Sequence, residues 1–226
     1  MLPFFILCCF AGVPQISSVN IEPASESVRT NIVPNFSFED VQNGIPSYWR
    51  WDSRNTDGKL TIDDQKYHTG KRSIKLQNNT PYGAHVYATL WTEPSIQVKP
   101  KTRYTLSFYA LSESPGVAWI GGGRNWQVRV SIQPTNGVWR RFSTEFVTAD
   151  DETSFTLRIN SDSPTTGFWI DDIKLEEGSG ATFCEPPLNH QSLVIASPDW
   201  QDAMSDGNWE NFFDIYSPKE QSVRLR

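Results

Sequence analysis

The stretch Arg103–Leu111 reads RYTLSFYAL, with apolar and polar side chains in alternation. Such alternation is typical of a β-strand that turns one face to a core and the other face outward. The positions expected in the core are Tyr104, Leu106, Phe108 and Ala110, and the outward ones are Thr105, Ser107 and Tyr109. This stretch therefore predicts a long strand at the centre of a β domain.

The same pattern recurs on both sides of that strand. Turn signals such as Asn43-Gly44 and Asp57-Gly58 separate the repeats, and no segment of helical length shows a 3.6-residue period. Further strands are expected at 35–40, 48–53, 59–63, 72–76, 85–91, 95–98, 126–132, 142–146, 155–159 and 168–175. Many short strands with regular turns predict an all-β fold, an antiparallel β-sandwich of the jelly-roll kind.

Aromatic residues make up 13% of the chain, and nine of them are Trp. One core of this size seldom needs so many, so some rings are expected to be exposed for ligand stacking. Trp49, Trp139 and Trp169 lie within strand patterns and are assigned to the core. Residues 114–126 are read as a flexible glycine-rich loop that carries Trp119 and Trp126; alternatively, Trp119 plugs the end of the sandwich.

Charge and hydropathy exclude two classes of partner. The net charge is −6 and the chain has no run of Lys and Arg, which disfavours nucleic-acid binding. No apolar stretch approaches the roughly 20 residues of a membrane-spanning helix.

The two ends of the chain differ from its middle. Residues 1–18 contain an apolar block and predict a signal peptide, and 19–29 a linker. The protein is therefore expected to be secreted or extracellular, with a periplasmic or cell-surface location as variants. Cys8 and Cys9 would leave with the signal, so Cys184 has no disulfide partner, and zinc has no support. Residues 183–226 are read as a linker and the start of a truncated second β domain, or as a tail that folds back.

Sugars are bound by aromatic rings and by polar side chains that hold hydroxyl groups. Outward strand positions and the loop offer both kinds of group. The candidates for carbohydrate binding are His85, Tyr87, Tyr109, Trp119, Trp126, Gln127, Arg129 and Arg158.

No catalytic constellation stands out in the sequence. There is no Ser-His-Asp order, Cys-His pairing or phosphate-binding loop. Asp171 and Asp172 are adjacent on a predicted strand and should point to opposite faces, which argues against a catalytic pair. No residue is therefore assigned a catalytic role.

Six short segments stand in an order that resembles a known family. The series resembles carbohydrate-binding modules of the CenC-like group, families four, nine and twenty-two. The segments are NIVPNFSFE at 31–39, GIPSYW at 44–49, GKRSIKL at 70–76, VKPKTRYTLSFYA at 98–110, WRRFS at 139–143 and WIDDIKLE at 169–176.

This resemblance implies a galactose-binding-like jelly roll over residues 30–182, with NFSFE as its opening strand. It also implies a monomeric, non-catalytic module that binds a polysaccharide or oligosaccharide beside the catalytic domain of a larger glycoside hydrolase. Two other functions stay open: an adhesion or interaction sandwich without sugar binding, and an intrinsic hydrolase.

The resemblance further implies a structural calcium ion that pins the chain ends. Its ligands would be Glu39, backbone oxygens near Lys71, and Asp171 or Asp172. The alternative is a metal-free cluster in which Lys71 or Arg72 satisfies the carboxylates.

Overall fold

The computed structural model describes residues 29–184. The predicted signal peptide and second domain, and nearly all of both linkers, lie outside the described residues. Across 29–184 the only helix is the short 3₁₀ turn η1 (Arg124–Trp126), so no helix there is long and apolar enough to cross a membrane.

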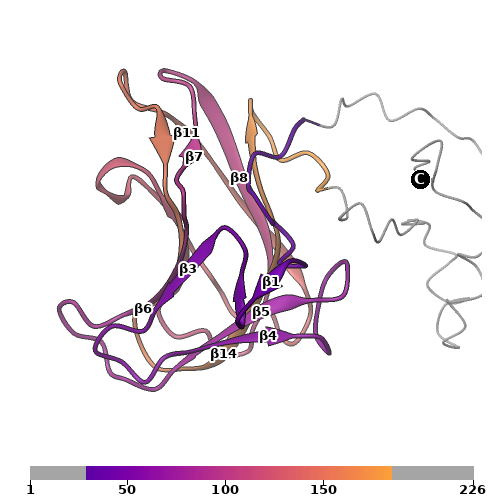
Figure 1. Ribbon diagram of the computed structural model, residues 1–226, viewed down its shortest axis with the longest axis vertical. Helices are drawn as coiled ribbons and strands as arrows, with labels where there is room; N and C mark the ends of the chain where they lie inside the picture. The colour runs from indigo at the N-terminus through magenta and orange to yellow at the C-terminus, as the bar shows by residue number, and fades with distance from the viewer. Residues whose placement is uncertain (1–28, 185–226) are drawn as a thin grey trace, which may run out of the picture. The chain divides into compact units, whose positions relative to one another are not determined.

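Two five-stranded antiparallel sheets form a β-sandwich (Figure 1), which confirms the predicted fold class. The first sheet has the order β10 (Val128–Ser131), β9 (Ala118–Gly122), β13 (Leu157–Ser161), β6 (Ala88–Thr92) and β3 (Trp49–Asp52). The second sheet has the order β11 (Arg140–Val147), β8 (Arg103–Leu111), β14 (Thr165–Glu177), β5 (Ser73–Asn78) and β4 (Lys59–Asp63). Two short pairs, β1 (Val41–Gln42) with β2 (Ile45–Pro46) and β7 (Ile96–Gln97) with β12 (Ser154–Phe155), complete the fold.

The core lies between the sheets and is built from the inward positions of the strands. On β8, Leu106, Phe108 and Ala110 are fully buried, as the alternation predicts. Phe108 stacks on Phe142 of β11 with 5.5 Å between ring centroids. This pair joins neighbouring strands of the second sheet, and burial of such inward rings in the core stabilises the sandwich.

Strand β9 corrects the prediction of a flexible loop at 114–126. Residues Ala118–Gly122 are a buried inner strand between β10 and β13. A Cβ atom at Gly121 would collide with the carbonyl of Val128, and one at Gly122 with the carbonyl of Thr156. These glycines therefore permit a close approach of neighbouring strands rather than flexibility.

The segment NFSFE at 35–39 is not the predicted opening strand. Residues 34–37 form a turn, and both Asn35 (φ 46°) and Phe38 (φ 57°) have left-handed backbone conformations. The Asn35 side chain holds this turn, because its amide donates to the carbonyls of Asp40 (2.7 Å) and Ser47 (3.1 Å). The turn buries Phe38 against Trp49, so the two phenylalanines serve the core without forming a strand.

Two of the three tryptophans assigned to the core lie elsewhere. Trp49 is buried in the core as expected. Trp169 is half-buried on the outer face of the second sheet, where its indole N–H donates to Asp63 at 2.6 Å. Trp139 is half-buried too, with its ring 5.9 Å from that of His68. Alternation indicates a face, but it does not distinguish a core from an outer surface that is covered by loops.

Candidate functional site

The outer face of the first sheet carries a row of large polar and aromatic side chains. The register aligns one residue from each strand, in the order Arg129, Gly121, Arg158, Trp91 and Arg50. Because neighbouring positions such as Leu90 and Ile159 are fully buried in the core, this row points away from it. We call this surface the outer face of the first sheet.

Guanidinium groups and indole rings alternate along this face. The Cζ atom of Arg158 lies 4.5 Å from the ring centroid of Trp126 and 5.7 Å from that of Trp91. Arg50 lies 6.0 Å from the Trp91 ring on its other flank. Such cation–π contacts hold the rings and the cations in fixed positions.

Trp126 is the exposed ring of the group. It lies on η1 with 49% of its surface exposed, and its ring meets that of Trp119 edge to face at 5.7 Å. Trp119 is only 4% exposed, and its indole N–H donates to Asp162 at 2.7 Å. Trp119 therefore supports Trp126 and Arg129 from beneath, whereas Trp126 is free to contact a ligand.

A cleft of about 450 Å³ opens beside Trp126 and Arg158. Its wall includes the hydroxyl-bearing residues Ser154 and Thr156. Glu152, also in the wall, accepts hydrogen bonds from the backbone of Arg124 and from the side chain of Gln127 at 3.0–3.1 Å. The predicted residue Gln127 thus orders the cleft wall.

Six of the eight predicted sugar-binding residues interact with one another or with the cleft wall: Tyr87, Trp119, Trp126, Gln127, Arg129 and Arg158. Tyr87 and His85 both precede β6. Tyr87 interacts electrostatically with Arg158, whereas His85 is exposed. Tyr109 lies on the second sheet, where its ring stacks on His68 at 3.6 Å. The alternation correctly places Tyr109 outward, but on the opposite side of the sandwich.

Arg50 and Asp162 belong to the face but were missed by sequence reasoning. The signal for Arg50 was present, since it alternates with Trp49 and Trp51, which both face the core. Asp162 follows β13 and binds the side chains of Trp119 and Arg129. Its role depends on contacts between strands, which the sequence order does not reveal.

The carboxylate of Glu39 faces N–H donors. Its Oε1 atom accepts hydrogen bonds from the backbone N–H groups of Lys71 (2.8 Å) and Arg72 (3.0 Å). The Arg72 guanidinium also donates to the Glu39 carbonyl. Glu39 therefore ties the 34–37 turn to the start of β5 through protein donors.

Asp171 and Asp172 reach the same loop, which corrects the prediction that they diverge. A register shift in β14 and a left-handed backbone at Asp172 (φ 49°) allow this. Asp171 accepts from the backbone of His68 at 2.7 Å, and Asp172 contacts the His68 ring at 2.6 Å and the Thr69 hydroxyl at 2.7 Å. Burial and then the adjacent Asp172 carboxylate raise the pKa of Asp171 well above its usual value.

N–H and O–H donors contact the carboxylate oxygens that a calcium ion would use as ligands. Within residues 29–184, no group of three or more His, Cys, Asp and Glu side chains gathers so that it could hold a metal. The calcium site stays a prediction that no observation tests.

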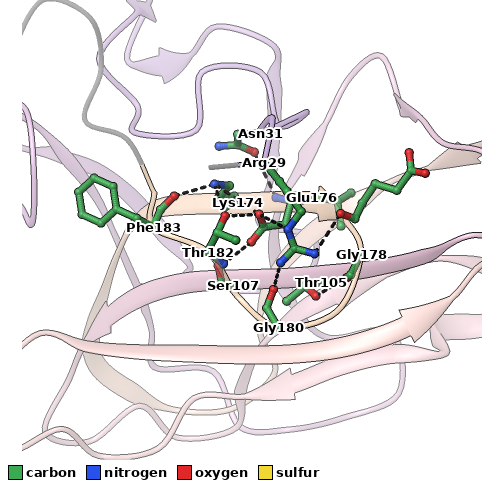
Figure 2. Close-up of polar contacts among 12 residues, drawn as sticks. Arg29, Asn31, Thr105, Ser107, Lys174, Glu176, Gly178, Gly180, Thr182 and Phe183 are labelled. Carbon is green, nitrogen blue, oxygen red and sulfur yellow. Dashed lines mark hydrogen bonds and ion pairs between the residues drawn. The ribbon is translucent and has the colours of Figure 1, made fainter. Parts of the chain in front are cut away.

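A buried ionic network joins the two ends of the described chain (Figure 2). Lys174 and Glu176 lie on β14 with side chains 1% and 0% exposed, and Lys174 Nζ is 3.4 Å from Glu176 Oε2. Arg29 Nε lies 3.3 Å from the same carboxylate oxygen. Thr182 donates to Glu176 through its backbone N–H (2.7 Å) and its hydroxyl, and Lys174 donates to the carbonyl of Phe183 (2.6 Å).

Fold and face together define a β-sandwich module whose first sheet has an aromatic, arginine-rich outer surface. Residues 30–166 match the family model described as a carbohydrate binding domain, CBM_4_9, and the chain belongs to this family. The resemblance seen in the sequence is thereby confirmed.

Comparison with solved structures finds similar sandwiches at low identity. The enzymatically active domain of tailspike protein 4 of bacteriophage CBA120 is 16% identical, with TM-score 0.49, over 66% of this chain and 21% of that one. The CBM22-1 xylan-binding domain of Paenibacillus barcinonensis Xyn10C is 13% identical, with TM-score 0.46, over 70% of this chain and 100% of that one. The CBM22-1 and GH10 modules of a Clostridium thermocellum xylanase are 15% identical, with TM-score 0.48, over 66% of this chain and 29% of that one. Comparison with curated protein sequences gives no match.

Proposed function

We propose that this protein is a secreted, monomeric and non-catalytic module that binds polysaccharide chains through the outer face of its first sheet. In this proposal it forms the N-terminal part of a larger glycoside hydrolase and keeps that enzyme on its substrate. The exposed ring of Trp126, held beside Arg158 at the rim of a cleft, is the observation that carries the proposal.

Trp126 would supply the apolar platform for a pyranose ring. Each such platform contributes on the order of 1 kcal/mol beyond the area that it buries. Hydroxyl groups of the sugar need polar partners in addition. Ser154 and Thr156, which line the cleft, offer such groups.

The test is affinity electrophoresis of the full chain through gels that contain xylan, glucan, mannan or pectin. Trp126→Ala should weaken the retarding interaction about fivefold or more, which corresponds to the loss of one platform. Trp139→Ala is the matched control, because Trp139 lies beside His68 rather than on this face. If no polysaccharide retards the wild-type chain, the adhesion function replaces the proposal. Release of reducing sugar by the purified chain would instead favour an intrinsic hydrolase.

Calcium is a separate prediction with its own test. Binding of the ion would require Glu39 and the aspartates to exchange their N–H and O–H donors for the metal. We expect calcium to raise the melting temperature of chelator-treated protein if this exchange occurs. An unchanged melting temperature at millimolar calcium would contradict the calcium site and favour the metal-free cluster.

A further inference from the structure

One arginine on the outer face of the first sheet lacks a counter-charge. Arg50 pairs with Glu93 at 2.9 Å, and Arg129 pairs with Asp162 at 3.2 Å. Among residues 29–184, the guanidinium of Arg158 makes neither an ion pair nor a hydrogen bond to a protein group; it lies close to the rings of Trp91 and Trp126. Among the described residues, the outer face of the first sheet therefore carries one guanidinium that no carboxylate neutralises.

The surroundings of Arg158 make this cation costly to leave unpaired. The side chain is half-buried between two indole rings, and burial lowers the pKa of its guanidinium. A charge that has lost part of its hydration is stabilised when an opposite charge binds it. The Cζ atom of Arg158 lies 4.5 Å from the Trp126 ring centroid and 5.7 Å from that of Trp91, and Arg158 lines the cleft.

The acidic residues of the cleft do not fill this role. Asp151 pairs with Arg124 at 2.8 Å. Glu152 is 5% exposed and accepts from the backbone of Arg124 and from Gln127. Both carboxylates are therefore engaged by other groups, and Arg158 stays available.

We infer that Arg158 binds an anionic group of the glycan, and that this face selects acidic polysaccharides, such as chains containing uronic acids, over neutral ones. This inference rests on the proposed function of the same face. A planar guanidinium binds a planar carboxylate through two parallel N–H···O bonds. In such a complex, Trp126 would stack on one sugar ring while Arg158 holds the carboxylate of the same ring or the next.

The experiment compares ligands before it compares variants. Isothermal titration would use the full chain with an oligogalacturonate, with its carboxyl-reduced neutral form and with a sulfated oligosaccharide. We expect the carboxylate form to bind about tenfold or more tightly than the neutral form, as for a charge-assisted hydrogen bond, and the preference to shrink as salt increases. This comparison needs only the wild-type protein.

Variants then assign the preference to a side chain. Arg158→Gln should reduce the preference to about unity and change binding of the neutral ligand much less, whereas Arg158→Lys should retain part of it because the charge remains. Arg103→Gln removes the same charge from the second sheet and should leave the preference intact. Melting temperatures would establish that each variant is folded.

The possible outcomes separate this inference from the proposed function. Equal binding of acidic and neutral ligands, or a preference that survives Arg158→Gln in a folded variant, overturns the role of Arg158 and leaves polysaccharide binding standing. A preference for the sulfated ligand that Arg158→Gln abolishes overturns the assignment of a carboxylate. Failure of every glycan to bind overturns both proposals.

Discussion

At the scale of single residues, Glu176 should be the most sensitive polar position in the domain. Its carboxylate is fully buried and contacts both Lys174 and Arg29, so its neutralisation removes an opposite charge that both cations share. We expect Glu176→Gln to lower the free energy of unfolding by about 3 kcal/mol, measured by urea denaturation. Glu177→Gln is the matched control, since that side chain is exposed and pairs with the exposed Lys99. An effect of Glu176→Gln no larger than the control would show that the network does not stabilise the fold.

Asp57 provides a pH-dependent contact between two loops. Hydrogen bonds from Asn79, first from its side chain and then from its backbone, together with those from Thr80, lower the pKa of Asp57 to about 2. Because the folded pKa lies below the unfolded value of 3.8, this stability is present above pH 4 and is lost as the pH falls toward 2. Asp57→Asn should therefore melt lower than wild type at pH 7 and converge with it near pH 2. Asp150→Asn, in an exposed ion pair with Lys101, should run parallel to wild type.

At the scale of elements, the segment 178–184 covers the outer face of the second sheet and depends on its glycines. Gly178 (φ 112°) and Gly180 (φ 73°) both have backbone conformations that disfavour side chains. A Cβ atom at Gly178 would collide with the guanidinium of Arg29, whereas one at Gly180 would meet open space.

This difference makes the two glycines a matched pair of variants. Gly180→Ala should cost about 1 kcal/mol, which is the backbone penalty alone. Gly178→Ala should cost about 2–3 kcal/mol by thermal denaturation, because strain and the collision with Arg29 add. Combining Gly178→Ala with Arg29→Ala should give less than the sum of the two single effects. Additive effects would mean that the collision is relieved elsewhere.

Strands were predictable wherever one face is buried and the side chains alternate. The ranges of β4 and β8 agree with the prediction. Strand β9 was not predicted, because its two glycines have no side chains that could alternate and are typical of a loop. Only the structure shows the carbonyls of Val128 and Thr156 beside them. The 34–37 turn was predicted as part of a strand, because Phe36 and Phe38 alternate with polar residues as strand residues do. The backbone instead takes left-handed conformations at Asn35 and Phe38.

At the scale of the whole molecule, the sequence predicts which kinds of side chain form the candidate face but not on which sheet they lie. Alternation marks Arg129, Arg158 and Tyr109 as outward, yet only the pairing of strands decides which sheet each belongs to. The buried pair Lys174 and Glu176 was also hidden, because residues 178–184 and Arg29 cover an outer face that would otherwise be solvated. Contacts between the two ends of a domain are long-range, and no local pattern encodes them.

The same contacts define where the module ends. The strands and the core lie within 32–177, but the buried pair Lys174 and Glu176 also contacts residues outside that range, namely Arg29, Thr182 and Phe183. A fragment of residues 29–184 should therefore melt cooperatively and bind the same polysaccharides as the full chain. A fragment of residues 32–177 should melt roughly 10–20 °C lower or fail to fold, because it uncovers this buried pair and removes its contacts with Arg29, Thr182 and Phe183. Calorimetry of the two fragments measures this difference, and equal melting temperatures would show that the strands alone hold the domain together.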